Sequence, residues 1–118
     1  MFKNLEQLIR TIRERKNSSP DKSYTNKLLN DKSLSVAKVK EEIGELIEAV
    51  EQDSNKIHEA ADVIYHLMVY LEANNIKLED VMSELKKRQK WATIKIIYSQ
   101  KFLEAKFLAK KFTKMTMS

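Results

Sequence analysis

The chain has 118 residues, 42% of them hydrophobic, which is enough for one domain with a modest core. It has no cysteine, which excludes disulfides and thiolate metal sites, and its single Gly and single Pro leave little material for tight hairpins. The net charge of +5 lies entirely in the tail, since residues 1–90 hold 16 basic and 16 acidic residues. We therefore expect an all-α protein and no nucleic-acid surface on its main body.

The first predicted helix covers residues 2–15, where apolar side chains recur at helical spacing. Charged residues interrupt these apolar positions, so the segment lacks the continuous apolar run of a signal peptide. The chain also has no run approaching the roughly 20 apolar residues that cross a bilayer. We expect a cytoplasmic protein with no membrane contact.

Turn-forming residues at 16–22 predict a loop, followed by a short helical turn at 24–29. A second long helix is predicted over 35–51 and a third from Ile57 to about Leu71, with a polar break at 52–55 that offers Asp53, Ser54 and Asn55 as caps. So short a break predicts that these two helices pack antiparallel.

Asn74 and Asn75 end the third predicted helix, because Asn tolerates the left-handed conformation, and Leu78 begins a fourth. The pattern predicts a small antiparallel bundle of four main helices within residues 1–90. Residues 91–118 form a basic, apolar extension that we expect to be helical and packed against another surface.

Two acidic pairs lie on the two consecutive long helices: Glu42 and Glu45 on the second, Glu59 and Asp62 on the third. Carboxylates three residues apart share one helix face, with Cβ atoms about 5 to 6 Å apart. On antiparallel helices the pairs can converge on Mg²⁺ or Mn²⁺, which prefer oxygen ligands. Glu42 borders the apolar stripe of its helix, whereas Glu41 points away from it.

Acidic residues at helical spacing usually form a solvated surface, but two such pairs on consecutive helices are less easily explained in that way. We expect Gly44, Ala60 and Ala61 to allow the helices to approach closely. A di-iron site is not expected, because the Glu-x-x-His motif that such sites use is absent. His66 is interpreted as a partly buried, hydrogen-bonded histidine and not as a ligand.

These residues resemble the metal motif of the MazG-like all-α nucleoside triphosphate pyrophosphohydrolases. Further segments make the stretch of residues 5–90 similar to the phosphoribosyl-ATP pyrophosphohydrolase family: Glu14 to Pro20, Ser23-Tyr24-Thr25, Lys27-Leu28, Ala60-Ala61-Asp62, Tyr65-His66-Leu67 and Leu78 to Val81. Lys40 departs from the pattern, since the family usually has Gly before the paired Glu. None of the metal-motif residues is missing.

The resemblance implies magnesium-dependent hydrolysis of the α–β phosphoanhydride of phosphoribosyl-ATP, in histidine biosynthesis, to phosphoribosyl-AMP and pyrophosphate. It implies Glu42, Glu45, Glu59 and Asp62 as metal ligands, with Mn²⁺ as an alternative ion, and Glu41 as a further ligand or water-orienting base. It also implies a homodimer and raises association with the phosphoribosyl-AMP cyclohydrolase. Substrate binding is expected of a polar and basic set: Arg15, Lys16, Ser23, Tyr24, Lys27 and Lys38.

Two alternatives stay open. The first is an enzyme of the same superfamily that removes non-standard nucleoside triphosphates. The second is a non-enzymatic helical binding module whose basic tail contacts nucleic acid or an acidic protein, with the carboxylates as ordinary surface. Activity on deoxynucleotides alone would favour the first, and steep salt dependence of binding would favour the second.

Overall fold

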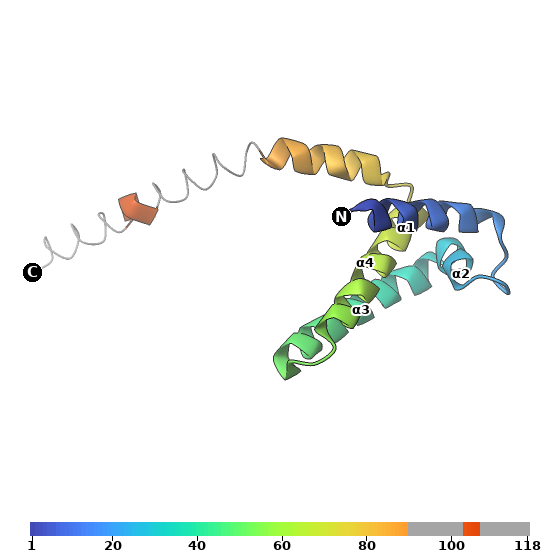
Figure 1. Cartoon of the computed structure of the whole chain (residues 1–118), viewed down its shortest axis with the longest axis horizontal. Coiled ribbons are helices and arrows are strands. Elements are labelled where there is room, and N and C mark those ends of the chain that lie inside the picture. The colour runs from blue at the N-terminus through green and yellow to red at the C-terminus, as the bar shows by residue number, and fades with distance from the viewer. Residues whose placement is uncertain (90–102, 107–118) are drawn as a thin grey trace, which may run out of the picture. The chain divides into compact units, whose positions relative to one another are not determined.

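The computed structural model describes residues 1–89 and 103–106, and these residues form helices and connecting turns with no β-strand (Figure 1). The prediction of an all-α protein is confirmed. The helices, in chain order, are α1 (Lys3–Glu14), the short 3₁₀ helix η1 (Arg15–Asn17), α2 (Tyr24–Asn30), α3 (Lys32–Gln52), α4 (Lys56–Ala73), a further helix over residues 78–89, and a single helical turn at 103–106.

Side-chain caps fix where two of the helices begin. The Ser23 hydroxyl accepts a hydrogen bond from the Asn26 amide at 3.1 Å and starts α2. The Asp31 carboxylate accepts one from the Leu34 amide at 3.0 Å, so α3 begins at Lys32, three residues before the predicted start. The predicted loop from residue 16 also begins too early, because η1 continues the helical path to Asn17.

Left-handed residues end the two long helices. The amides of Asp53 and Ser54 donate to the carbonyls of Val50 and Ala49, and Asp53 has φ 52°, which gives the paired hydrogen bonds of a Schellman turn at the end of α3. Asn75, with φ 58°, occupies the equivalent position after α4, as predicted. Asn55 stands at the start of α4 but makes no side-chain cap hydrogen bond.

The hydrophobic core joins α1, α2 and the C-terminal half of α4. Its buried members are Ile9 and Ile12 from α1, Leu28 from α2, and Met68 and Val69 from α4. Partly buried residues that pack around them are Leu5, Leu8, Leu29, Leu34, Tyr65 and Leu78. The core therefore holds one half of α4, and the other half is left to pack on α3.

α3 and α4 form a helical hairpin closed by the turn at residues 53–55, and they lie side by side in antiparallel directions as predicted (Figure 1). The end of this hairpin points away from α1 and α2 (Figure 1). Several large apolar side chains on it are exposed: Ile43, Ile47, Val50, Ile57, Ile64 and Leu67. The hairpin thus carries apolar surface that the described part of this chain does not cover.

The chain divides into two compact units after Leu78. The fourth predicted helix is present from residue 78 to at least residue 89. Within the described residues, no helix is both long and apolar enough to span a membrane. Apart from residues 103–106, the predicted helical extension over 91–118 lies outside the described residues.

Candidate carboxylate site

The buried face of α3 contains a glutamate at its centre. The three buried residues of α3 are Ser35, Glu42 and Ala49, each seven residues from the next. Two helical turns separate such positions, so they follow one line along the helix. None of them is a large apolar residue, and Glu42 is only 8% exposed. A carboxylate occupies the position where a core residue would be expected.

Glu42 belongs to a group of three carboxylates that spans the α3–α4 contact. One carboxylate oxygen from each of Glu42, Glu45 and Glu59 lies within 4.8 Å of the other two. The helical spacing of Glu42 and Glu45 brings them onto one face of α3, and the antiparallel packing brings Glu59 of α4 to them. Three of the four predicted carboxylates therefore converge across the two helices.

Two oxygens of this group are buried and have no hydrogen-bond partner among the described residues: Oε2 of Glu42 and Oε2 of Glu59. Burial raises the pKa of Glu42, and the neighbouring Glu45 carboxylate raises it further. The same two causes, in the same order, raise the pKa of Glu59. Buried, unpartnered acceptors destabilise a fold unless something satisfies them, and a bound cation would do so.

The fourth predicted ligand, Asp62, lies one turn along α4 and joins a second group with His58 and Glu59. The ligand atoms of these three residues also lie within 4.8 Å of one another, and His58 Nε2 is 3.3 Å from Asp62 Oδ2. Glu59 is common to both groups. The four predicted carboxylates therefore form one continuous cluster, with a histidine at its edge that the sequence did not suggest.

A hydrogen-bonded chain runs from α2 to the cluster through His66, which is 8% exposed. His66 Nδ1 lies 2.8 Å from the Asp62 carbonyl oxygen, which can only accept, so Nδ1 carries a proton. Nε2 is then free to accept from the Tyr24 hydroxyl at 3.3 Å. The Thr25 and Tyr65 hydroxyls are hydrogen-bonded beside this chain. His66 is thus a hydrogen-bonded histidine, as predicted, and it connects Tyr24 to the metal-motif helix.

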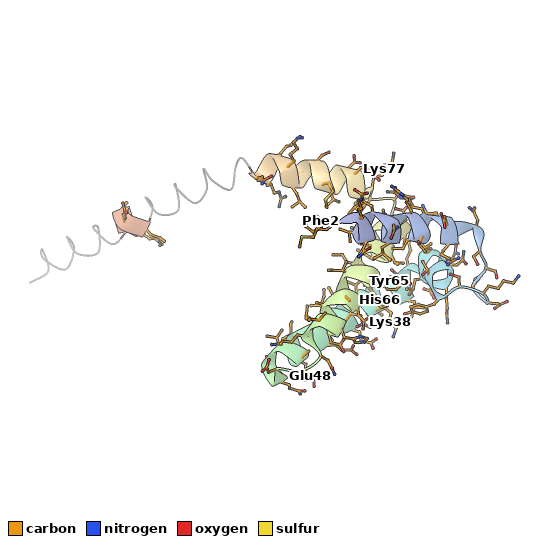
Figure 2. All side chains as sticks on the ribbon, viewed as in Figure 1. Phe2, Lys38, Glu48, Tyr65, His66 and Lys77 are labelled. Atoms are coloured by element: carbon orange, nitrogen blue, oxygen red, sulfur yellow. The ribbon has the colours of Figure 1, made fainter. Side chains whose placement is uncertain are left out.

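Figure 2 places Lys38 of α3 near Tyr65 and His66, with Glu48 towards the 53–55 end of the hairpin. The Lys38 ammonium donates to Glu41 at 3.2 Å, which raises the pKa of Lys38. Glu41 is exposed, and it faces this lysine and not the two groups of ligand atoms. Burial raises the pKa of the nearby Tyr24 hydroxyl.

Some of the other predicted substrate-binding residues already form contacts with other residues of the protein. Lys16 Nζ lies 2.6 Å from Oε1 of Glu72, and the Ser23 hydroxyl caps α2. Arg15 and Lys27 are exposed, and Arg15 lines an open depression of about 490 Å³ formed with residues 14, 17–19 and 22. Their role in substrate binding stays a prediction.

Two buried polar residues were not predicted. Glu72 is 9% exposed and forms ion pairs with both Lys16 and Arg13. Asn26 is 1% exposed, and its side-chain amide donates hydrogen bonds to the carbonyls of Arg15 at 2.8 Å and Ser18 at 3.0 Å. Both partnerships tie the η1 segment to the helices. The only available signal for Glu72 was its position within the apolar run that ends α4.

The expectation that Gly44 allows close helix packing is wrong. A Cβ built on Gly44 would have no atom of another described segment within 4 Å, and the residue is exposed. Gly44 lies on the opposite side of α3 from the buried line, because it is two positions after Glu42 and the helix rotates about 100° per residue.

The fold and the cluster define the class of this protein: an all-helical domain with an oxygen-donor site at the contact of two antiparallel helices. The phosphoribosyl-ATP pyrophosphohydrolase family model matches residues 5–89, and the chain belongs to this family. It is 43% identical over 91 residues to the phosphoribosyl-ATP pyrophosphatase of Cereibacter sphaeroides, which covers 72% of this chain and 85% of the relative.

Other relatives extend this comparison. The phosphoribosyl-ATP pyrophosphatase of Clostridium acetobutylicum is 46% identical over 89 residues, or 71% of this chain and 79% of the relative. The histidine biosynthesis trifunctional protein of Kluyveromyces lactis is 39% identical over 103 residues, covering 87% of this chain but 12% of that protein. In that relative, the sequence similar to this chain is a small part of a much longer polypeptide.

Proposed function

We propose that this protein hydrolyses the α–β phosphoanhydride of phosphoribosyl-ATP, giving phosphoribosyl-AMP and pyrophosphate, in histidine biosynthesis. Family membership and the names of the relatives support the substrate. The observation that carries the proposal is the buried Glu42 carboxylate, whose Oε2 has no partner at the centre of the α3–α4 contact. A binding module with a solvated acidic surface would not need a glutamate there.

Glu42, Glu45, Glu59 and Asp62 would hold the metal ion, which we propose to be Mg²⁺, with Mn²⁺ as the alternative. Two observations support a hard divalent cation at this site. The possible ligand atoms are mainly carboxylate oxygens, and the buried Oε2 atoms of Glu42 and Glu59 have no hydrogen-bond partner among the described residues. When bound, the ion would offset the negative charge of the triphosphate and polarise the bond that breaks. A carboxylate cluster without a cation would repel that substrate.

The remaining polar residues would position the substrate. Tyr24 is hydrogen-bonded to His66 and is 47% exposed, so a substrate at the cluster could contact its exposed part. Arg15 and Lys27 are exposed cations that flank Tyr24 in the sequence, and we assign phosphate contacts to them. For Glu41, which pairs with Lys38, we propose the role of accepting a proton from water.

The test is pyrophosphate release from phosphoribosyl-ATP with Mg²⁺, compared with ATP and dCTP. We expect release from phosphoribosyl-ATP that a chelator abolishes and that Asp62→Asn loses. Glu48→Gln is the matched control, because Glu48 is an exposed α3 glutamate that bonds to Gln52 and not to the cluster. Release from dCTP but not from phosphoribosyl-ATP would instead identify a nucleotide-sanitising enzyme.

We further propose that the protein is a homodimer through the exposed apolar side chains of the α3–α4 hairpin. Ile57 is 89% exposed and Ile47 55% exposed, which is unusual for a helix pair that carries a buried site. A second copy of the same hairpin would cover both. Association with the phosphoribosyl-AMP cyclohydrolase stays a prediction, for which the trifunctional relative is the available support.

A further inference from the structure

The hydrogen bonds of His66 determine whether the Tyr24 hydroxyl can donate or accept at the site. His66 Nδ1 lies 2.8 Å from the backbone carbonyl oxygen of Asp62, and a carbonyl oxygen can only accept. Nδ1 therefore carries the proton of the neutral imidazole, and Nε2 is left as an acceptor. The Tyr24 hydroxyl, 3.3 Å from Nε2, is then the donor of the second hydrogen bond. His66 is 8% exposed, so water has little access to either bond.

The Tyr24 hydroxyl has a single proton, and His66 takes it. Burial raises the pKa of Tyr24 above its ordinary value, so the hydroxyl is not ionised at neutral pH. With its proton bonded to Nε2, the Tyr24 oxygen can only accept a hydrogen bond from a substrate. Ionised phosphate oxygens are acceptors as well, so they cannot pair with this oxygen. The group that Tyr24 contacts must therefore carry an O–H or N–H.

Tyr24 lies beside the carboxylate cluster and is reachable from solvent. Glu42 and Lys38 are close enough to act on the charge of its hydroxyl, and its side chain is 47% exposed. If the triphosphate is bound at the cluster, the nearest hydrogen-bond donors of the substrate belong to the ribose that is bonded to it. The N–H groups of the base are farther along the molecule. A ribose hydroxyl is therefore the donor that best fits the position of Tyr24.

We propose that Tyr24 accepts a hydrogen bond from a hydroxyl of the ribose that carries the triphosphate, and that His66 is the positioning residue that fixes this direction. The inference rests on the proposed function and names the part of the substrate that Tyr24 recognises. It separates the role of Tyr24 from the phosphate contacts proposed for Arg15 and Lys27. A substrate without that hydroxyl leaves the Tyr24 oxygen without a donor.

The tautomer of His66 can be measured by NMR on the full chain, at mildly alkaline pH and without any ligand. Long-range proton–nitrogen correlations distinguish a protonated Nδ1 from a protonated Nε2, and His58→Ala assigns the signals of the two histidines. We expect His66 to be protonated at Nδ1. A proton on Nε2 would make Tyr24 the acceptor of that bond, would free the Tyr24 proton for a phosphate, and would overturn the proposal.

The substrate contact is tested with phosphoribosyl-ATP and two analogues, each of which lacks one hydroxyl of the ribose that carries the triphosphate. For the natural sequence, we expect one analogue to have a KM roughly three- to tenfold higher, with kcat nearly unchanged. Tyr24→Phe should raise the KM of phosphoribosyl-ATP by a similar factor and remove the difference between the two substrates. The ratio of the two KM values is the readout, because a change in metal affinity would affect both substrates equally.

Two variants of His66 test its positioning role. His66→Phe retains a ring but offers no acceptor to Tyr24, so the KM difference should be lost. His66→Gln offers a carbonyl oxygen as acceptor and should restore part of that difference. Tyr65→Phe is the matched control, because the Tyr65 hydroxyl bonds to Thr25 and the ring that packs edge-on against His66 is kept. It should show the KM ratio of the natural sequence.

Equal KM values for the three substrates in the natural sequence, or a difference that persists in Tyr24→Phe, would overturn the ribose assignment and leave the proposed hydrolysis standing. A KM difference that His66→Phe leaves intact would remove the positioning role of His66. If this variant does not fold, Tyr24→Phe and the tautomer measurement still decide the proposal. The absence of any turnover of phosphoribosyl-ATP by the natural sequence would overturn the proposed function and the ribose assignment together.

Discussion

The ammonium of Lys16 lies 2.6 Å from a carboxylate oxygen of Glu72, a residue that is 56 positions away in the sequence and 9% exposed. Arg13 Nε approaches the other oxygen of the same carboxylate at 3.4 Å. Glu72 thus joins the end of α1 and the start of η1 to the C-terminal end of α4. Lys16 and Arg13 are partly exposed, so loss of these ion pairs would destabilise the two cations less than it would destabilise the buried Glu72 carboxylate.

Glu72→Gln should therefore lower the free energy of unfolding by about 1.5 to 3 kcal/mol, the range for hydrogen bonds to charged groups. Chemical denaturation at neutral pH measures the loss. Glu51→Gln is the control, since Glu51 is exposed at the end of α3, and its effect should stay within about 0.5 kcal/mol. Equal stability of the two variants would show that the Glu72 contacts contribute nothing.

Glu42→Gln should stabilise the metal-free protein at neutral pH. Burial and Glu45 raise the pKa of Glu42 in the folded state above its ordinary value of 4.5, so the ionised carboxylate opposes folding once the pH exceeds that value. The neutral amide removes this penalty. In chelator, Tm of the variant should exceed that of the natural sequence by a few degrees at pH 7, and the difference should vanish below about pH 4, where the unfolded-state carboxyl is also protonated.

The same variant should lose the rise in Tm that Mg²⁺ gives the natural sequence. A variant that is less stable than the natural sequence in chelator at pH 7 would contradict the account of Glu42 as a buried, unsatisfied carboxylate. Glu48→Gln is again the control, because an exposed glutamate should give neither effect.

Gly44→Ala should raise the free energy of unfolding by about 1 kcal/mol, the difference in helix propensity between Gly and Ala. The added methyl meets no atom, so nothing offsets the gain. Pyrophosphate release should be unchanged. Thermal denaturation checks the stability, and a loss in place of a gain would mean that a second copy of the chain packs against this side of α3.

Asn26→Asp should loosen the η1 segment. The Asn26 amide donates to the carbonyls of Arg15 and Ser18 and accepts from Asn30 at 3.0 Å, whereas a carboxylate at this position could not donate to those carbonyls. We expect a loss of about 2 kcal/mol of stability for the two buried hydrogen bonds. If Arg15 contacts phosphate, KM should rise while kcat stays nearly constant. Asn17→Asp, an exposed change in the same segment, should affect neither KM nor stability.

Ile47→Lys and Ile64→Lys should each shift the protein towards a monomer, because a buried lysine in an apolar interface is strongly disfavoured. Light scattering across a range of protein concentrations measures the mass. Phe2→Lys, which also changes an exposed apolar residue but at the N-cap of α1, should leave the mass unchanged. A mass that none of the three variants alters would remove the hairpin from the interface.

The sequence predicted what depends on local spacing, and it failed where distant residues decide the structure. Glu42 and Glu45, or Glu59 and Asp62, are three residues apart on one helix, so their common face followed from helical periodicity. The antiparallel hairpin followed from the short polar break. Asn26 and Glu72 were missed because their partners come from other helices, and no local pattern records such contacts.

The errors at α3 have two different origins. Its start was placed too late because residues 32–35 lack an apolar stripe, although Asp31 three residues before Leu34 is a capping signal. Gly44 was taken as a packing residue from its small size, but only the structure shows which side of the helix faces α4. The position of His58 beside the cluster was overlooked because it depends on Glu59 and Asp62 being oriented toward the same point.

The three-residue turn at 53–55 also determines the direction in which the acidic residues of α4 point around the helix axis. Asp53 and Asn55 both adopt left-handed geometry there, and α4 begins immediately afterwards. One residue inserted into or deleted from α4 before Glu59 would turn the acidic pair by about 100° around the helix axis. The hairpin could still form, but Glu59 would face away from Glu45. The length of this connection therefore constrains the chemistry of the protein more tightly than it constrains its fold.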